Sequence, residues 1–554
     1  MAIRNNIHLL LIFSVFILPL SVTAQEKLVK EVQVVKPYEP TISDAFKITH
    51  LPVISDTVKT IPEVKYYMHT KPLNIGYTID PIKPAKMVGE PLSHLYNSYV
   101  KLGVGTKLLP LFEAYVGNKR SKDYSVGAYY KLQNSYAQVK LDNDESEFAG
   151  FSDHDLQFFG KKFLKNSIIY GNLGLSSSTR YCYGYNTQID TTLEKSGIKQ
   201  NFLSYGLDAG YKSNYVDSAH INYDFKVLLD YTKDKFSNNE FGFGVSGDVN
   251  KIFTKQMVGV SLAIHHYSVS ENIDSVGSTI VKINPWVGFF GLKWRVKAGI
   301  NIASDLHGDQ TKSGYYPVGS VEYDIANSYL IPYAGVDGKL QVNNFKAIAA
   351  QNPFLMPATG VKNTSHKVIL FGGVRGNFNM STYYNFRLSY SVVEDMPFYV
   401  NNLANTDSIG NKFDVTYDNI ELTHYFGELS VSPSEKLYLS AKANYREYKM
   451  KNESKPWHIP AFDLTFSAKY NLQQKIILKA DIFYIGKRFA KLDNTGGYKE
   501  LESAIDINFG AEYRYSKTLS AFIQLNNILS ENYYQWNYYP AYGFNFLVGA
   551  TYSF

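Results

Sequence analysis

The feature that most constrains the fold is a series of alternating segments that extends from about residue 94 to residue 554. In each segment of roughly ten residues, apolar and polar side chains alternate, and turn-forming residues separate one segment from the next. A period of two places alternate side chains on opposite faces of a β-strand. The final segment carries one such apolar row: Phe544, Phe546, Val548, Ala550, Tyr552 and Phe554. The chain therefore predicts an all-β fold.

Charged side chains keep to one face of these segments. Asp506, Glu512 and Arg514 share a face, which a dry core would not accept but a hydrated barrel lumen would. The opposite face is apolar and aromatic. The chain has 46 Tyr and 34 Phe, yet its mean hydropathy is only -0.22. This balance is expected when half of each strand faces lipid and half faces water.

No apolar stretch of about 18 residues follows residue 24, which excludes a transmembrane helix. A chain that crosses a membrane with strands must close them into a barrel, because lipid offers no partner to an open sheet edge. Counting segments back from Phe554 gives about 22 strands, and an even number is required if both ends lie on the same side. Residues 94–554 therefore predict a large transmembrane antiparallel β-barrel.

The first 24 residues have the features of a signal peptide. Arg4 precedes an apolar run over residues 8–18, and the small residues Val22, Thr23 and Ala24 precede Gln25. The residue directly after this site is Gln25 and not Cys, so we do not expect a lipid-anchored N-terminus. The remainder of the chain is predicted to be exported.

Residues 25–93 are predicted to form an extended arm, periplasmic or lumenal. They hold eight of the twenty prolines, which prevent a long helix or a central strand. These prolines are Pro37, Pro40, Pro52, Pro62, Pro72, Pro81, Pro84 and Pro91. The arm is either a flexible leader or a docking segment, in which the β-prone residues 31–35 add a strand to a partner's sheet. We expect a periplasmic or envelope protein partner to bind through residues 26–90.

The connections between the predicted strands alternate in length. Short turns are expected at residues 432–435, 471–473 and 515–517. Longer loops are expected at residues 179–199, 343–364, 393–417, 487–498 and 527–541. Outer-membrane barrels have short periplasmic turns and long external loops, so we assign the long loops to the cell exterior.

Residues 521–554 resemble the end of TonB-dependent outer-membrane receptors. In that family a pair of asparagines precedes the last long loop. A Pro-x-x-Gly sequence then leads into the last strand, which ends in Phe. The matching residues here are Asn526, Asn527, Pro540, Gly543 and Phe554. The residue after the glycine is Phe544, where the family usually has Arg.

The resemblance implies a 22-stranded barrel of the transport or channel class. It also implies that Phe554 is the signal by which the barrel assembly machinery recognises the last strand. The family carries a folded plug domain ahead of its barrel, whereas residues 25–93 are too few and too rich in proline for that domain. Either the barrel lacks a plug, or the arm or another protein fills it, so the resemblance does not imply the family's energy coupling.

Alternation alone identifies candidate lumen residues. They are Lys442, Asn444, Arg446, Lys479, Asp481, Asp506, Asn508, Glu512, Arg514, Gln524 and Asn526. A strongly ion-selective pore would carry one sign of charge, and this set is mixed. The residues either line a hydrated lumen or simply stabilise the wall through ion pairs.

Other constellations indicate no metal, cofactor or catalytic site. His265 and His266 are adjacent on a strand and point to opposite faces, so they do not share a metal ion. Residues 142–147 form an acidic loop without the spacing of a calcium site. The only cysteine, Cys182, permits no intrachain disulfide and is expected to be a small buried residue. No nucleophile, zinc or phosphate-binding motif is present, so we do not expect an enzyme.

Two functions fit this sequence. The first is a transport or channel barrel, similar to TonB-dependent receptors, in the outer membrane of a Gram-negative bacterium. The second is a structural barrel subunit of an envelope assembly, with the N-terminal arm as its tether. The expected partners are outer-membrane lipid and lipopolysaccharide, attracted by the net charge of +6, and not nucleic acid. The Tyr-, Asn- and Lys-rich composition is typical of Bacteroidota outer-membrane proteins.

Overall fold

The computed structural model describes residues 96–554, apart from 189–191, 216–217, 272, 274–275, 358, 403–408 and 493–495. The predicted signal peptide and N-terminal arm lie outside the described residues. No helix in the described part of the chain is long and apolar enough to span a membrane.

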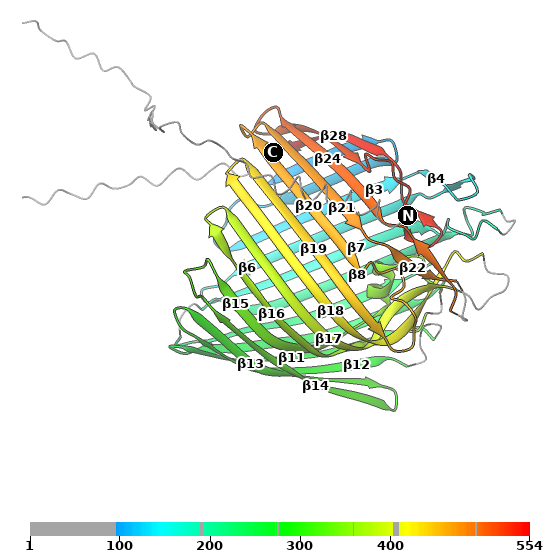
Figure 1. Cartoon of the computed structure of the whole chain (residues 1–554). Coiled ribbons are helices and arrows are strands. Elements are labelled where there is room, and N and C mark those ends of the chain that lie inside the picture. Colours follow the sequence, from blue (N-terminus) through cyan, green and yellow to red (C-terminus); the bar gives the residue numbers. More distant parts are fainter. Residues whose placement is uncertain are drawn as a thin grey trace, which may run out of the picture. The chain divides into compact units, whose positions relative to one another are not determined.

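The described residues form a closed antiparallel barrel of 22 strands, as predicted (Figure 1). Each strand pairs with the next barrel strand along the chain, and β1 pairs with β28 to close the ring. The barrel strands are β1 (Ser98–Gly105), β2 (Leu108–Gly117), β3 (Tyr124–Ser135), β6 (Phe151–Phe163), β7 (Ser167–Tyr181), β8 (Lys199–Ser213), β9 (Ile221–Lys233), β10 (Asn239–Ile252), β11 (Gln256–Val269), β12 (Ser278–Phe290), β13 (Trp294–His307), β14 (Gln310–Tyr323), β15 (Ile331–Gln341), β16 (Thr364–Asn379), β17 (Thr382–Asn401), β18 (Phe413–Ser434), β19 (Leu437–Met450), β20 (Phe462–Leu472), β21 (Ile476–Ile485), β24 (Ala504–Arg514), β25 (Leu519–Asn526) and β28 (Asn545–Ser553).

Smaller elements occupy the long connections. Three two-stranded sheets and one helix lie there: β4 (Gln138–Lys140) with β5 (Ser146–Phe148), β22 (Arg488–Lys491) with β23 (Tyr498–Leu501), β26 (Tyr534–Trp536) with β27 (Tyr539–Pro540), and α2 (Phe345–Gln351). The side chain of Asn344 caps α2 by accepting a hydrogen bond from the Ala347 N–H.

The β1–β28 seam shows why the last strand has its sequence. Phe546 and Val548 are each 37% exposed on the outside of the sheet, whereas the intervening Leu547 is 3% exposed. At Gly549 a Cβ atom would lie 2.1 Å from the carbonyl oxygen of Leu102, so only glycine allows this approach. Gly105 approaches the Phe546 carbonyl oxygen in the same way, so alternation and close-packed glycines let the terminal strand complete the ring.

The two ends of the barrel differ in their connections. At the short-turn end, where β28 ends, the chain reverses over residues 435–436, 473–475 and 515–518, close to the predicted turns. At the opposite, long-loop end, residues 136–150, 182–198, 342–363, 451–461, 486–503 and 527–544 connect the strands.

One predicted loop, residues 393–417, is wrong in its bounds. β17 continues to Asn401 and β18 begins at Phe413, with a bulge between Val393 and Met396. The extended hairpin buries one face against the long loops, because Phe398 and Val400 pack there with Ile420 and Trp457. Because this face is buried, the two strands stay paired beyond residue 393, where the sequence predicted that a surface loop begins.

Candidate functional site

The predicted lumen residues form a polar face that is largely paired within itself. Arg446 and Asn444 both bond to Asp463, and Lys442 lies 3.2 Å from Glu428. In the same way the Ser467 hydroxyl donates to Asp481 at 2.6 Å, Arg514 lies 3.5 Å from Glu512, and Asn526 donates to Asn545 at 3.0 Å. The side chains of Lys479 and Gln524 have no hydrogen bond or ion pair with another described residue. Their assignment to a hydrated lumen stays a prediction.

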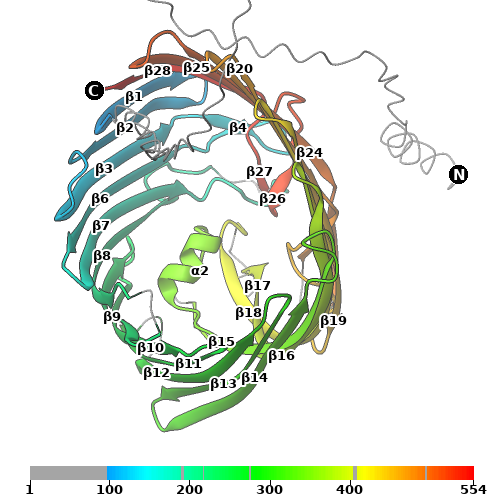
Figure 2. The same ribbon diagram turned by 90° about the vertical axis from the view of Figure 1, so that its left-hand side faces the viewer.

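Two of these residues hold long-loop residues against the wall. Asp506 accepts a hydrogen bond from the Tyr533 hydroxyl at 3.0 Å, and Asn508 accepts one from the Asn527 N–H at 3.0 Å. On the other side of the ring, Lys346 of α2 donates to Asp230 of β9 at 2.8 Å. Figure 2 shows α2, β26 and β27 inside the ring of strands.

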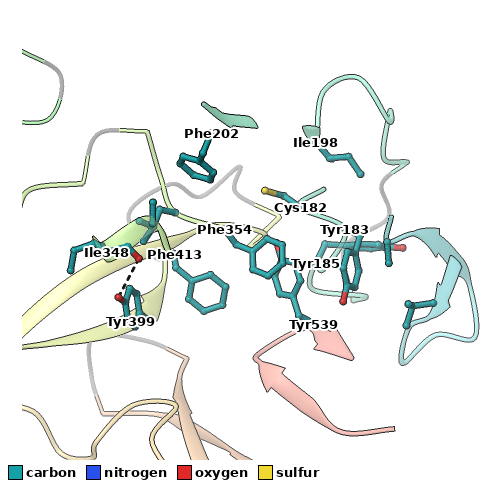
Figure 3. Close-up of a cluster of buried hydrophobic side chains, with 14 of the residues drawn as sticks. Cys182, Tyr183, Tyr185, Ile198, Phe202, Ile348, Phe354, Tyr399, Phe413 and Tyr539 are labelled. Carbon is teal, nitrogen blue, oxygen red and sulfur yellow. Dashed lines mark hydrogen bonds between the residues drawn. The ribbon is translucent and has the colours of Figure 1, made fainter. Parts of the chain in front are cut away.

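The described residues of the long loops pack together into what we call the loop layer: residues 136–150, 182–198, 342–363, 451–461, 486–503 and 527–544, with the loop-side ends of β17 and β18. Four of these connections, residues 136–150, 182–198, 342–363 and 527–544, share one apolar cluster with the ends of β17 and β18, seen in Figure 3. Residues 451–461 and 486–503 contribute to a second cluster, around Phe398 and Trp457. Members of the first cluster include Val139, Leu141, Ala149, Cys182, Tyr183, Tyr185, Ile198, Phe345, Ile348, Ala349, Phe354, Leu355, Tyr399, Phe413 and Tyr539. These residues follow strands on different sides of the ring, so the loop layer extends across the mouth of the barrel.

Phe413 lies at the centre of the loop layer. Its side chain is 0% exposed and its ring lies 5.5 Å from the rings of His458 and Trp536. Its backbone N–H donates to the Phe354 carbonyl at 2.9 Å, and its carbonyl accepts from the Met356 N–H at 2.8 Å. Phe413 therefore joins three of the connections that make up the layer to the end of β18: residues 342–363, 451–461 and 527–544.

A second group of contacts links loops that are far apart in the sequence. The Tyr539 ring stacks on Phe354 at 3.9 Å and meets the Tyr183 ring edge-on at 4.9 Å (Figure 3). The Tyr183 hydroxyl donates to the Pro540 carbonyl at 2.9 Å. Cys182 is buried beside them, and burial raises the pKa of its thiol to about 11, as expected for a packing residue rather than a reactive one.

His458 is buried in the loop layer as a neutral imidazole. Its Nδ1 atom donates to the Tyr399 carbonyl at 2.9 Å, and its Nε2 atom accepts from the Asn537 N–H at 3.2 Å. Burial lowers the pKa of His458 from 6.5 to about 4. A proton on Nε2 would face the Asn537 N–H, so protonation conflicts with the closed arrangement.

We expect acid to loosen the loop layer through His458. Its pKa is lower in the closed layer than in an opened one, so stability is fully present above about pH 6.5 and falls as the pH drops toward 4. The difference of about 2.5 pKa units corresponds to about 3 kcal/mol. Hydrogen exchange of residues 451–461, followed between pH 7 and pH 4, should accelerate in the native chain. His458→Gln should make the exchange rate of these residues less dependent on pH. An unchanged pH dependence in this variant would contradict the role of His458.

A cavity of about 340 Å³ lies beside His458, between the loop layer and the ends of the neighbouring strands. Its lining mixes aromatic, aliphatic and polar side chains, without an acidic, lysine or arginine side chain: Gln341, Gln351, Thr364, His366, Met396, Pro397, Tyr399, Trp457, His458, Ile459 and Trp536. The volume is at the lower end of the range for small-molecule sites. Amide, hydroxyl and ring groups of this kind suit an uncharged solute.

Sequence reasoning placed its candidates on the wall and missed the loop layer. The loops do carry a signal, since aromatic residues concentrate in them: Tyr183 and Tyr185 continue an alternation that begins at Tyr181, the end of β7, and Trp536, Tyr538 and Tyr539 lie together in another loop. Surface loops seldom need so many large apolar side chains. No described group of three or more metal-ligating side chains accompanies them.

The architecture defines a class of protein before any particular relative is considered: a large outer-membrane-type barrel with long, inward-folded loops at one end. No family model and no curated protein matches the sequence.

Solved structures match the fold closely. The FrpB iron transporter from Neisseria meningitidis, F3-3 variant, has a TM-score of 0.65 at 9% identity, covering 84% of this chain and 82% of that chain. The siderophore receptor PirA from Acinetobacter baumannii has a TM-score of 0.65 at 11% identity, covering 84% and 81%. The ferric-catecholate import receptor Fiu from E. coli K12 has a TM-score of 0.62 at 10% identity, covering 83% and 82%.

At these identities the likeness concerns the fold. The resemblance to TonB-dependent receptor barrels, predicted from residues 521–554, is thereby confirmed at the level of architecture. These neighbours are described as transporters and receptors rather than enzymes, in agreement with the expectation that this chain is not an enzyme.

Proposed function

We propose that this chain is a receptor or transport barrel of a Gram-negative outer membrane, and that the loop layer is its gate. The shared apolar cluster of the loop layer carries the proposal. A passive pore needs an open mouth, whereas a packed layer bonded to the wall at Asp506, Asn508 and Asp230 must move before a solute passes. The barrel folds of the iron and siderophore receptors support the transport class.

The cavity is the candidate contact point for a solute. Its uncharged lining favours a solute with hydroxyl, amide or ring groups over a small ion. Tyr399, Trp457 and His458 belong both to the cavity lining and to the loop layer. A solute bound to them would therefore act directly on the packing of the layer. Lipid, lipopolysaccharide and the assembly machinery, recognising Phe554, are further proposed partners, and the Bacteroidota origin rests on composition.

The orientation of the barrel is part of the proposal: the loop layer faces the cell exterior and the short turns face the periplasm. An epitope tag inserted after Asp309, in the exposed β13–β14 turn, should be detected on intact cells. A tag after Glu435 should be detected only once the outer membrane is breached. The reverse pattern would show that the short turns face the cell exterior and that the proposed orientation is wrong. Residues 345–349 are unsuitable for insertion, because Phe345, Ile348 and Ala349 are buried.

The structural-subunit hypothesis remains the second candidate, and the packed loop layer also favours it, because a scaffold does not need an opening. Deletion of residues 26–90 separates the two functions. We expect the barrel to assemble, since every described strand remains. For a transport barrel the deletion should change permeability to large antibiotics while partner proteins are still recovered in mild detergent. Unchanged permeability with loss of a stoichiometric partner would instead support the tether.

A further inference from the structure

Three turns at the short-turn end share an arrangement of apolar and basic side chains. We call them the lysine turns: residues 162–165 between β6 and β7, residues 251–255 between β10 and β11, and residues 292–294 between β12 and β13. Each places a large exposed apolar side chain, Leu164, Phe253 or Leu292, beside lysines. The lysines are Lys162, Lys165, Lys251, Lys255 and Lys293.

The apolar members of the lysine turns continue the outer face of the barrel. Phe243 and Val245 are exposed on the outer face of β10, and the same alternation carries Lys251 and Phe253 to that face. Trp294 begins the outward row of β13 that continues to Ile300. The turns therefore lie at the rim where the apolar wall meets water.

The lysines of the lysine turns have no acidic partner among the described residues. Lys251 lies 5.6 Å from the ring of Phe253, and no ion pair joins Lys165, Lys255 or Lys293 to a described carboxylate. Arg295, on the inner face near the same rim, does have an acidic partner, because it bonds to Glu322 at 2.9 Å. The lysines of these turns thus form an exposed positive band at the short-turn rim.

We propose that the lysine turns bind anionic glycerophospholipid in the adjoining leaflet. The inference rests on the proposed membrane location. Lysine stems lie along apolar surface while their ammonium groups reach the water, and phosphate headgroups stand at that depth. Apolar turn tips such as Leu164 and Leu292 would enter the acyl boundary between the headgroups. An aromatic side chain such as Trp294 is typical of this interface.

The surface fits lipid better than an acidic protein. The lysines sit at the edge of the proposed lipid-facing wall, and Phe289 and Trp294 continue its apolar surface up to the turn that holds Lys293. A protein partner would have to displace lipid from those side chains. The positive charges are also spread over separate turns, which matches a layer of many headgroups more closely than one compact acidic patch.

Trp294 provides a direct test, because it lies beside Lys293. The full chain is reconstituted in vesicles containing phosphatidylcholine and phosphatidylglycerol, with one or the other lipid brominated to quench tryptophan fluorescence. The Trp294→Phe variant gives the background from Trp286, Trp457 and Trp536. We expect stronger quenching of Trp294 by brominated phosphatidylglycerol. Lys293→Gln should reduce the preference roughly fivefold, the usual effect of one lysine near an anionic lipid surface.

Lys297→Gln is the matched control. Lys297 is four residues away on β13, lies 4.8 Å from the Trp286 ring and faces inward, so its loss should leave the preference intact. Equal quenching by both lipids in the native chain, or an unchanged preference in Lys293→Gln, would overturn the inference. Absence of quenching by either lipid would mean that β13 does not face lipid, and the membrane proposal would fail with it. A Phe253→Trp variant reports the neighbouring turn in the same way.

Discussion

Replacing Phe413 with alanine is expected to open the loop layer while the barrel stays folded. Truncating a fully buried phenylalanine costs about 3–5 kcal/mol, and Phe413, which is 0% exposed, contacts three loop segments. Hydrogen exchange should therefore accelerate together in residues 182–186, 345–355 and 536–539. If no other segment fills the lumen, conductance in planar bilayers should rise as well.

Phe386→Ala is the matched control, because Phe386 is 53% exposed on the outer face of β17. It removes the same atoms from the same hairpin without touching the loop layer. Faster exchange confined to the residues next to position 413 would mean that the loops are independent of one another. The layer could not then act as one gate.

The barrel was predictable because each strand repeats the same local signal. Alternation in residues 504–514 separates Asp506 from Ile505 and Ile507 without knowledge of any neighbouring strand. Antiparallel pairing between consecutive strands then needs only a short turn. Twenty-two repetitions of a weak signal, ending at Phe554, determine the architecture more firmly than any single segment does.

The loop layer was not predictable in the same way, because its contacts are not local. Tyr183 and Pro540 are 357 residues apart and meet only after the barrel has closed. Aromatic residues in the loops indicate burial, yet they do not specify which loop is the partner. The extension of β17 to Asn401 has the same origin, since the face that carries Phe398 is stabilised by Trp457 from another loop.

The paired polar face explains why the wall candidates alone do not reveal a substrate. Arg446, Asn444 and Asp463 satisfy one another, so they contribute to the wall whatever passes beside them. The cavity at His458 lacks such internal pairing of charges, and its lining residues come from three connections and from the ends of β15, β16 and β17. Specificity in this chain is therefore expected in the loops, where sequence periodicity carries no information.

Replacing Ile523 with arginine should destabilise the barrel in a membrane by about 2–4 kcal/mol if the residue lies near the midplane. Ile523 is 38% exposed on the outer face of β25, between Ala521 and Leu525. The new charge would lie against hydrocarbon, where no carboxylate or water compensates it. The change can be measured by urea unfolding in vesicles, or by the fraction that keeps the fast gel mobility of a folded barrel before heating.

Gln524→Arg, one residue along β25, is the sharpest comparison. The side chain points to the opposite face and has no hydrogen bond or ion pair with another described residue, so its replacement removes nothing. Asn508 would be a poorer comparison, because its side chain accepts the Asn527 N–H and helps to anchor the loop layer. We expect Gln524→Arg to cost much less than Ile523→Arg. Equal losses at both positions would mean that the two faces of the wall do not separate lipid from water.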